Sequence, residues 1–96
     1  MEKKSLSILD GFGSLESAIK DLEVAPKALA YLNKVNKEIG EMGFINDDRK
    51  VIVRECQNMI EICRNYLNAP QSVQPSDYGK AMILLFKNLK ILEQVK

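Results

Sequence analysis

Two stretches of this 96-residue chain place apolar residues at alternating intervals of four and three, and this spacing constrains the fold most. Because an α-helix turns once in about 3.6 residues, the spacing puts these side chains on one helical face. The positions are Ala28, Leu32, Val35, Ile39 and Met42 in the first stretch, and Tyr78, Met82, Leu85, Leu89 and Leu92 in the second. Alternation typical of β-strands does not stand out, so the sequence predicts an all-α protein.

A third helix is predicted between these two, over residues 46–68, NDDRKVIVRECQNMIEICRNYLN. Asn46 or Asp47 is the expected N-cap, and the early acidic residues suit the positive end of the helix dipole. A wide apolar stripe indicates that this helix also faces a core. The stripe consists of Ile52, Val53, Cys56, Met59, Ile60, Cys63, Tyr66 and Leu67.

The N-terminal part predicts a shorter helix after a loose or partly helical lead-in at residues 1–13. Ser14 is the expected N-cap of this helix. One face carries Leu15, Ala18, Ile19 and Leu22. Pro26 indicates a break near Ala25, because proline suits the first turn of a helix and not its interior.

Short connections join the predicted helices. Gly43 is the expected end of the helix that follows Pro26. Residues 69–76, APQSVQPS, are predicted as a loop, with Ser76 or Asp77 as the cap of the last helix. Short connections favour antiparallel neighbours, so we expect one domain, residues 1–96, folded as an antiparallel bundle of three longer helices plus a short N-terminal helix.

The residue types present exclude several kinds of chemistry. The chain has no histidine, which rules out Ser-His-Asp and Cys-His nucleophilic sites and the Glu-x-x-His sites of di-iron bundles. Cys56 and Cys63 do not supply the four ligands of a structural zinc site, and on one helix they are too far apart for a disulfide. We therefore expect two buried thiols in a reducing compartment, no enzymatic activity, no cofactor and no metal.

Charge and hydropathy predict a small soluble protein of the cytoplasm. The formal net charge is +1, which implies no strong field toward nucleic acids or membranes. The apolar run at residues 81–95, AMILLFKNLKILEQV, is shorter than the roughly 20 residues that span a bilayer. The N-terminal apolar residues are interrupted by serines, so no transmembrane segment or secretory signal is expected.

Residues 80–96 carry more apolar residues than one core-facing stripe needs. On a helical wheel the core arc holds Ala81, Met82, Leu85, Phe86, Leu89 and Leu92, and the polar arc holds Lys80, Lys87, Lys90 and Gln94. A second apolar cluster, Leu84, Ile91 and Val95, lies outside the core arc. Either the N-terminal segment covers this cluster, or the cluster stays exposed and docks a partner.

The favoured function is that of a non-enzymatic protein that binds another protein through a helical surface, as an inhibitor, adaptor or immunity-type neutraliser. Only size and helical plan match bacteriocin-immunity proteins and phage-encoded inhibitors, so this is an analogy. The candidate partner-binding residues are Leu84, Ile91 and Val95, with Lys87 and Lys90 at the rim. A homodimer formed through the same surface is an open alternative.

The second hypothesis is a nucleic-acid-binding regulator that uses the lysines of the second helix. Lys20, Lys27, Lys34 and Lys37 form a basic strip in the sequence. Phosphate binding needs such clusters on one face. Acidic residues are interleaved with these lysines, and no recognition-helix or stacking-aromatic pattern accompanies them, so nucleic acid is the less favoured partner.

Overall fold

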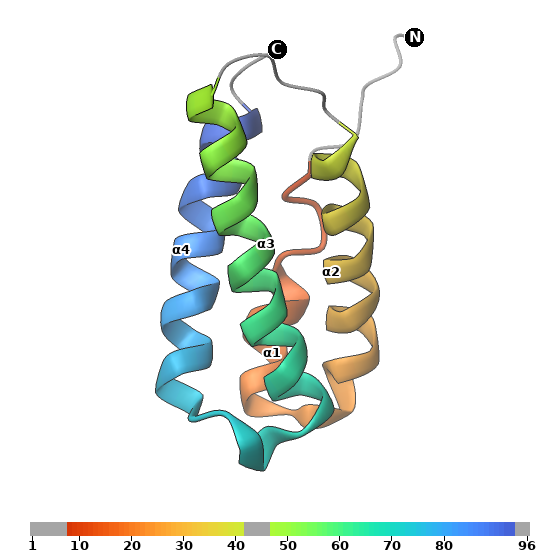
Figure 1. The fold of residues 1–96 in the computed structure, drawn as a ribbon. Coiled ribbons are helices and arrows are strands. Elements are labelled where there is room, and N and C mark those ends of the chain that lie inside the picture. Colours follow the sequence, from red (N-terminus) through yellow and green to blue (C-terminus); the bar gives the residue numbers. More distant parts are fainter. Residues whose placement is uncertain (1–7, 42–46, 94–96) are drawn as a thin grey trace, which may run out of the picture.

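The computed structural model, which describes residues 8–41 and 47–93, is a bundle of four α-helices (Figure 1). The helices are α1 (Gly13–Lys20), α2 (Ala25–Gly40), α3 (Asp47–Asn68) and α4 (Pro75–Glu93). Short 3₁₀ turns, η1 (Leu22–Val24) and η2 (Pro70–Ser72), lie before α2 and α4. No strand occurs in these two ranges. The predicted all-α bundle of three longer helices and a short N-terminal helix is confirmed.

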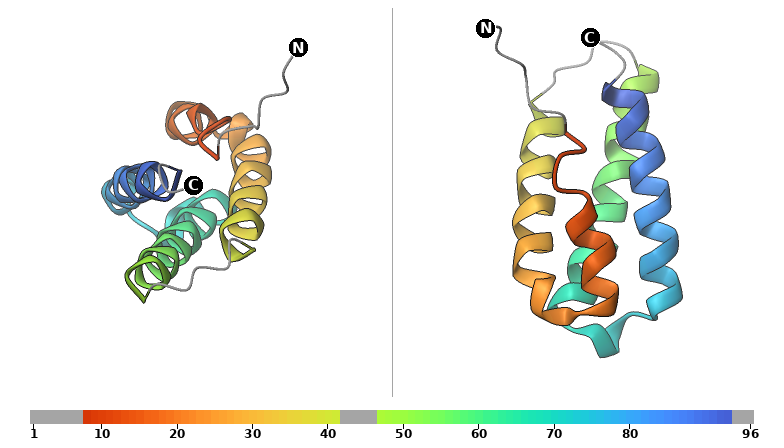
Figure 2. Two further views of the ribbon diagram at one scale, coloured as in Figure 1. Left: turned by 90° about the horizontal axis from the view of Figure 1, so that it is seen from above. Right: turned by 180° about the vertical axis from the view of Figure 1, so that it is seen from behind.

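Seen along the bundle, the helices occupy the corners of a ring in the order of the chain (Figure 2). Both α1 and α3 therefore lie beside α2 and α4. Successive helices run in opposite directions, as the short connections predict (Figure 1). Among the four neighbouring pairs, α3 and α4 share the most extensive contact, and α1 and α4 the smallest. Most of the packing of α4 thus comes from α3.

Most residues of the predicted apolar stripes form one continuous core, whereas Ile19, Leu22 and Phe86 are exposed. The buried members are Ala28, Leu32, Val35 and Ile39 of α2, Cys56, Ile60, Cys63, Tyr66 and Leu67 of α3, and Tyr78, Leu85, Leu89 and Leu92 of α4. Ile52, Val53, Met59 and Met82 are half-buried, and Met42 lies outside the described residues. Within residues 8–41 and 47–93, the core contains no charged side chain.

The predicted helix caps are wrong in detail. α1 begins at Gly13, so Phe12 takes the cap position, and the Ser14 hydroxyl donates instead to the Gly11 carbonyl oxygen at 2.7 Å. The break before α2 is present, and Asp21 caps the turn there by accepting from the Glu23 amide at 3.0 Å. Of the two predicted caps of α3, Asp47 lies in the first turn of the helix, and Asn46 lies outside the described residues. The predicted helix end Gly43 lies outside them as well.

The last helix also begins earlier than predicted. It starts at Pro75, so Ser76 and Asp77 lie in its first turn and not at its cap. Proline fits this position because its missing N–H would have no helical partner there. Asp77 still stabilises the helix start, since a carboxylate in the first turn complements the dipole.

Two buried tyrosine hydroxyls hold the N-terminal segment on the bundle. Tyr31 of α2 donates to the Ile8 carbonyl oxygen at 2.6 Å, and Tyr78 of α4 donates to the Leu15 carbonyl oxygen at 2.7 Å. Phe12 lies in the sequence between the two acceptor residues, Ile8 and Leu15. Its side chain is buried, and its ring lies 6.0 Å from that of Tyr31. Residues 8–12, part of the predicted lead-in, are therefore packed and not loose.

Removal of either hydroxyl should loosen this segment. Tyr31→Phe and Tyr78→Phe should each lower the free energy of unfolding by about 1 kcal/mol, because each leaves a buried carbonyl with one partner fewer. Urea denaturation followed by circular dichroism measures the change. Tyr66→Phe is the matched control, because no hydrogen bond of its hydroxyl occurs in the described parts of the chain. Equal effects of all three variants would contradict the assignment.

Gly11 allows the chain to turn into α1. Its φ is +93°, a conformation that residues with a Cβ rarely adopt, and a Cβ there would lie 3.0 Å from Cδ1 of Tyr31. Gly11→Ala should therefore destabilise the protein by about 1–2 kcal/mol.

Gly79→Ala should instead stabilise it by up to about 1 kcal/mol, because that glycine lies within α4 with open space around it. Thermal denaturation of the two variants tests the opposite signs.

Candidate functional site

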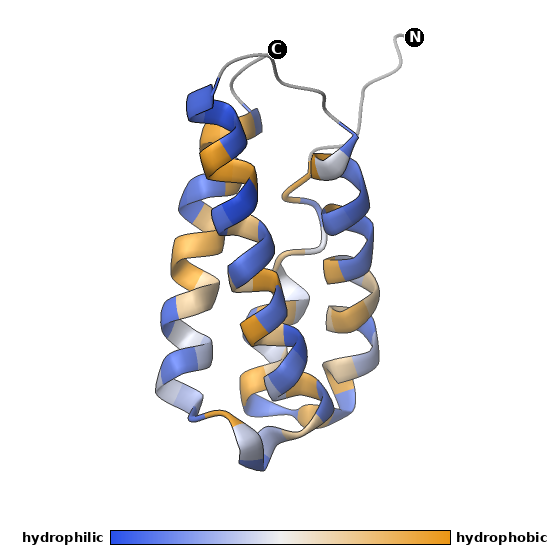
Figure 3. Cartoon of the chain, in the orientation of Figure 1, coloured by the Kyte–Doolittle hydropathy of each residue, from blue (hydrophilic) through white to orange (hydrophobic). Residues whose placement is uncertain are grey.

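α4 carries most of the exposed apolar surface of the described residues. Four of the seven large apolar side chains that are exposed there belong to this helix. They are Ile83, Leu84, Phe86 and Ile91; the other three are Ile19, Leu22 and Val51. Figure 3 shows the apolar residues crowded in the upper half of α4. Most of the apolar residues predicted in excess of the core-facing stripe of the last helix are therefore exposed.

The N-terminal segment covers only one flank of α4. The Phe12 ring lies 4.9 Å from the ring of Phe86, which is on the flank of α4 that faces α1. Leu84 and Ile91 point to the other flank and remain 43% and 40% exposed. Of the two alternatives, the structure thus favours an exposed cluster for these two residues. Val95, the third member, lies outside the described residues.

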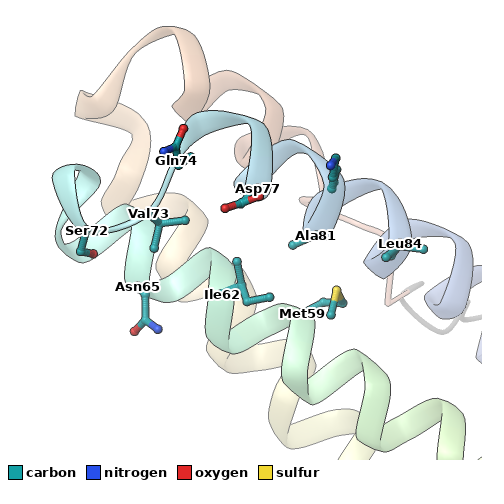
Figure 4. Close-up of a pocket in the computed structure, with 10 residues that line it drawn as sticks. Met59, Ile62, Asn65, Ser72, Val73, Gln74, Asp77, Ala81 and Leu84 are labelled. Carbon is teal, nitrogen blue, oxygen red and sulfur yellow. The ribbon is translucent and has the colours of Figure 1, made fainter.

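A groove between α3 and α4 lies directly beside Leu84 (Figure 4). Its volume is about 430 Å³. The apolar lining consists of Met59, Ile62, Val73, Ala81 and Leu84. The polar lining consists of Asn65, Ser72, Gln74, Asp77 and Lys80. The groove thus combines apolar and polar side chains.

One hydrogen bond shows how α3 and α4 align. Asn88 Nδ2 donates to Glu55 Oε1 at 3.3 Å. Since the helices are antiparallel, one turn from this bond brings Met59 beside Leu84, as the groove lining confirms. Val51, one turn from Glu55 in the other direction, lines a separate cleft with Asp47, Lys50 and Arg54.

We call the surface formed by Met59, Ile62, Leu84 and Ile91 the α3/α4 face. The α4 half of this face was predicted from the sequence, whereas Met59 was predicted only as part of the core-facing stripe of α3. The signal for the α3 half was present in Ile62, an apolar residue outside that stripe.

The lysines of α4 follow its outer ridge. Lys80 lines the groove, and Lys87 lies seven residues later and so on the same side of the helix. Lys90 Nζ lies 5.5 Å from the centre of the Phe86 ring, which places it toward α1. Of the two predicted rim residues, Lys90 therefore borders the flank that faces α1, and Lys87 also lines a cleft on that flank.

A second, smaller cleft lies on that opposite flank. Its volume is about 130 Å³, and it is lined by Phe12, Glu16, Met82, Ile83, Phe86 and Lys87. Phe12 already fills the space against α4 there. This cleft is therefore too small to hold more than one side chain of another molecule.

The lysines of the second hypothesis do not form an uninterrupted basic face. Lys27 and Lys37 are exposed on α2, and Lys34 is half-buried. Glu38 and Glu41 follow within one turn and bring opposite charge to the same end of the helix. The interleaved acidic residues give no support to nucleic-acid binding through these lysines, which stays a prediction.

Titratable groups in the described residues show no activated nucleophile. Burial raises the pKa of Cys56 and of Cys63 to about 12, with a smaller contribution from Glu55 for Cys56. Burial likewise raises the pKa of Tyr31 and Tyr78. All four groups therefore stay protonated at neutral pH, whereas a reactive thiol needs a lowered pKa. The predicted free, buried thiols are confirmed.

Other kinds of site leave no trace in residues 8–41 and 47–93. No group of three or more cysteine, aspartate or glutamate side chains there is arranged to hold a metal ion. None of the helices in these ranges is long and apolar enough to cross a membrane. No family model, curated protein or solved structure matches the chain. The α3/α4 face is therefore the candidate site that the geometry singles out.

The raised thiol pKa values predict a loss of stability at alkaline pH. In the unfolded chain the thiols ionise near pH 9, whereas in the folded protein they keep their protons to about pH 12. Since the unfolded state then binds fewer protons, the free energy of unfolding should fall as pH rises between these values. Urea titrations at increasing pH measure the slope.

The Cys56→Ala/Cys63→Ala variant is the control for this slope. Its free energy of unfolding should fall less steeply over the same range. Each thiol removed should reduce the slope by up to about 1.4 kcal/mol per pH unit. The tyrosines keep part of the slope, because their pKa values are raised as well. Identical slopes in the two proteins would contradict the role of the thiols.

Proposed function

We propose that this protein is a non-enzymatic binding protein that recognises another protein through the α3/α4 face. The observation that carries the proposal is the exposure of Leu84 and Ile91 beside an apolar groove, on the flank of α4 that the N-terminal segment does not contact. Contiguous exposed apolar surface with a polar border is typical of protein-binding sites. An inhibitor, an adaptor and an immunity-type neutraliser all act in this way, without catalytic groups.

The energetics support a central role for these two side chains. Full burial of a leucine or isoleucine side chain contributes roughly 1.5–3 kcal/mol, so covering the exposed part of each should contribute about 1 kcal/mol. The groove adds Met59 and Ile62, which are half-buried in the free protein. Binding energy in interfaces concentrates in a few central apolar residues within a polar border. Leu84 and its groove have this arrangement.

Leu84 and Ile91 are not part of the buried core, which separates binding from folding. Leu85, Leu89 and Leu92 form the buried stripe of α4 and are at most 1% exposed. Leu84 and Ile91 lie beside this stripe. Substitution of the exposed pair should therefore change binding more than stability.

The double variant Leu84→Ser/Ile91→Ser tests the proposal. It should keep the helical content of the parent protein and lose no more than about 2 kcal/mol of unfolding free energy. It should fail to retain the partner that the parent protein captures from cells that produce it. Affinity capture with mass spectrometry, together with light scattering to detect self-association, measures both outcomes.

Ile19→Ser/Leu22→Ser is the matched control. These residues are apolar and 40% and 47% exposed, but they lie in α1 and η1, away from the α3/α4 face. The control should capture the same partner as the parent. Equal capture by all three proteins, or unfolding of the Leu84/Ile91 variant alone, would refute the proposed binding surface.

A further inference from the structure

We draw no further inference here: the strongest candidate, the exposed apolar surface of α4 beside the groove between α3 and α4, belongs to the site already described, and nothing in the structure shows what covers it.

Discussion

The packing of α4 against α3 is the interaction on which the rest of the structure depends. α4 lies beside only two other helices, and its contact with α1 is small, so α3 supplies most of the surface that buries its leucines. The same contact brings Leu84 beside Met59 and Asn88 within hydrogen-bond distance of Glu55. Core and candidate binding face are thus two sides of one helix pair. A shift of α4 along α3 would therefore alter the core and the binding face at once.

Apolar spacing was sufficient to predict the helices, because a helix that packs on one side retains a period of 3.6 in its sequence. The helix starts were harder to predict. Ser14 and Ser76 have the right chemistry for caps, but a left-handed Gly11 and a proline at the start of α4 moved both helix starts toward the N-terminus. Local geometry of this kind depends on neighbours far along the chain, such as Tyr31 beside Gly11.

Only half of the candidate site could be predicted from the sequence. Leu84 and Ile91 were identified because they exceed what one core-facing stripe on α4 needs. Ile62 was not, since it looks like an isolated apolar residue until the side of α3 that meets α4 is known. The order of helices around the ring determines that side, and no periodicity within one helix encodes it. The rim lysines show the same limit: Lys87 and Lys90 were placed at the edge of the predicted cluster, yet both lie toward the flank that faces α1.

The hydrogen bond from Tyr78 to the Leu15 carbonyl oxygen joins residues 63 positions apart. During synthesis on the ribosome, α1 therefore emerges long before the side chain that holds it on the bundle. The packing surface of α1 on α2 is available early, whereas its contact with α4 must wait until α4 has been made. The bundle thus closes late, by joining its first helix to its last, and a nascent chain that stops before α4 lacks the contact that completes the ring.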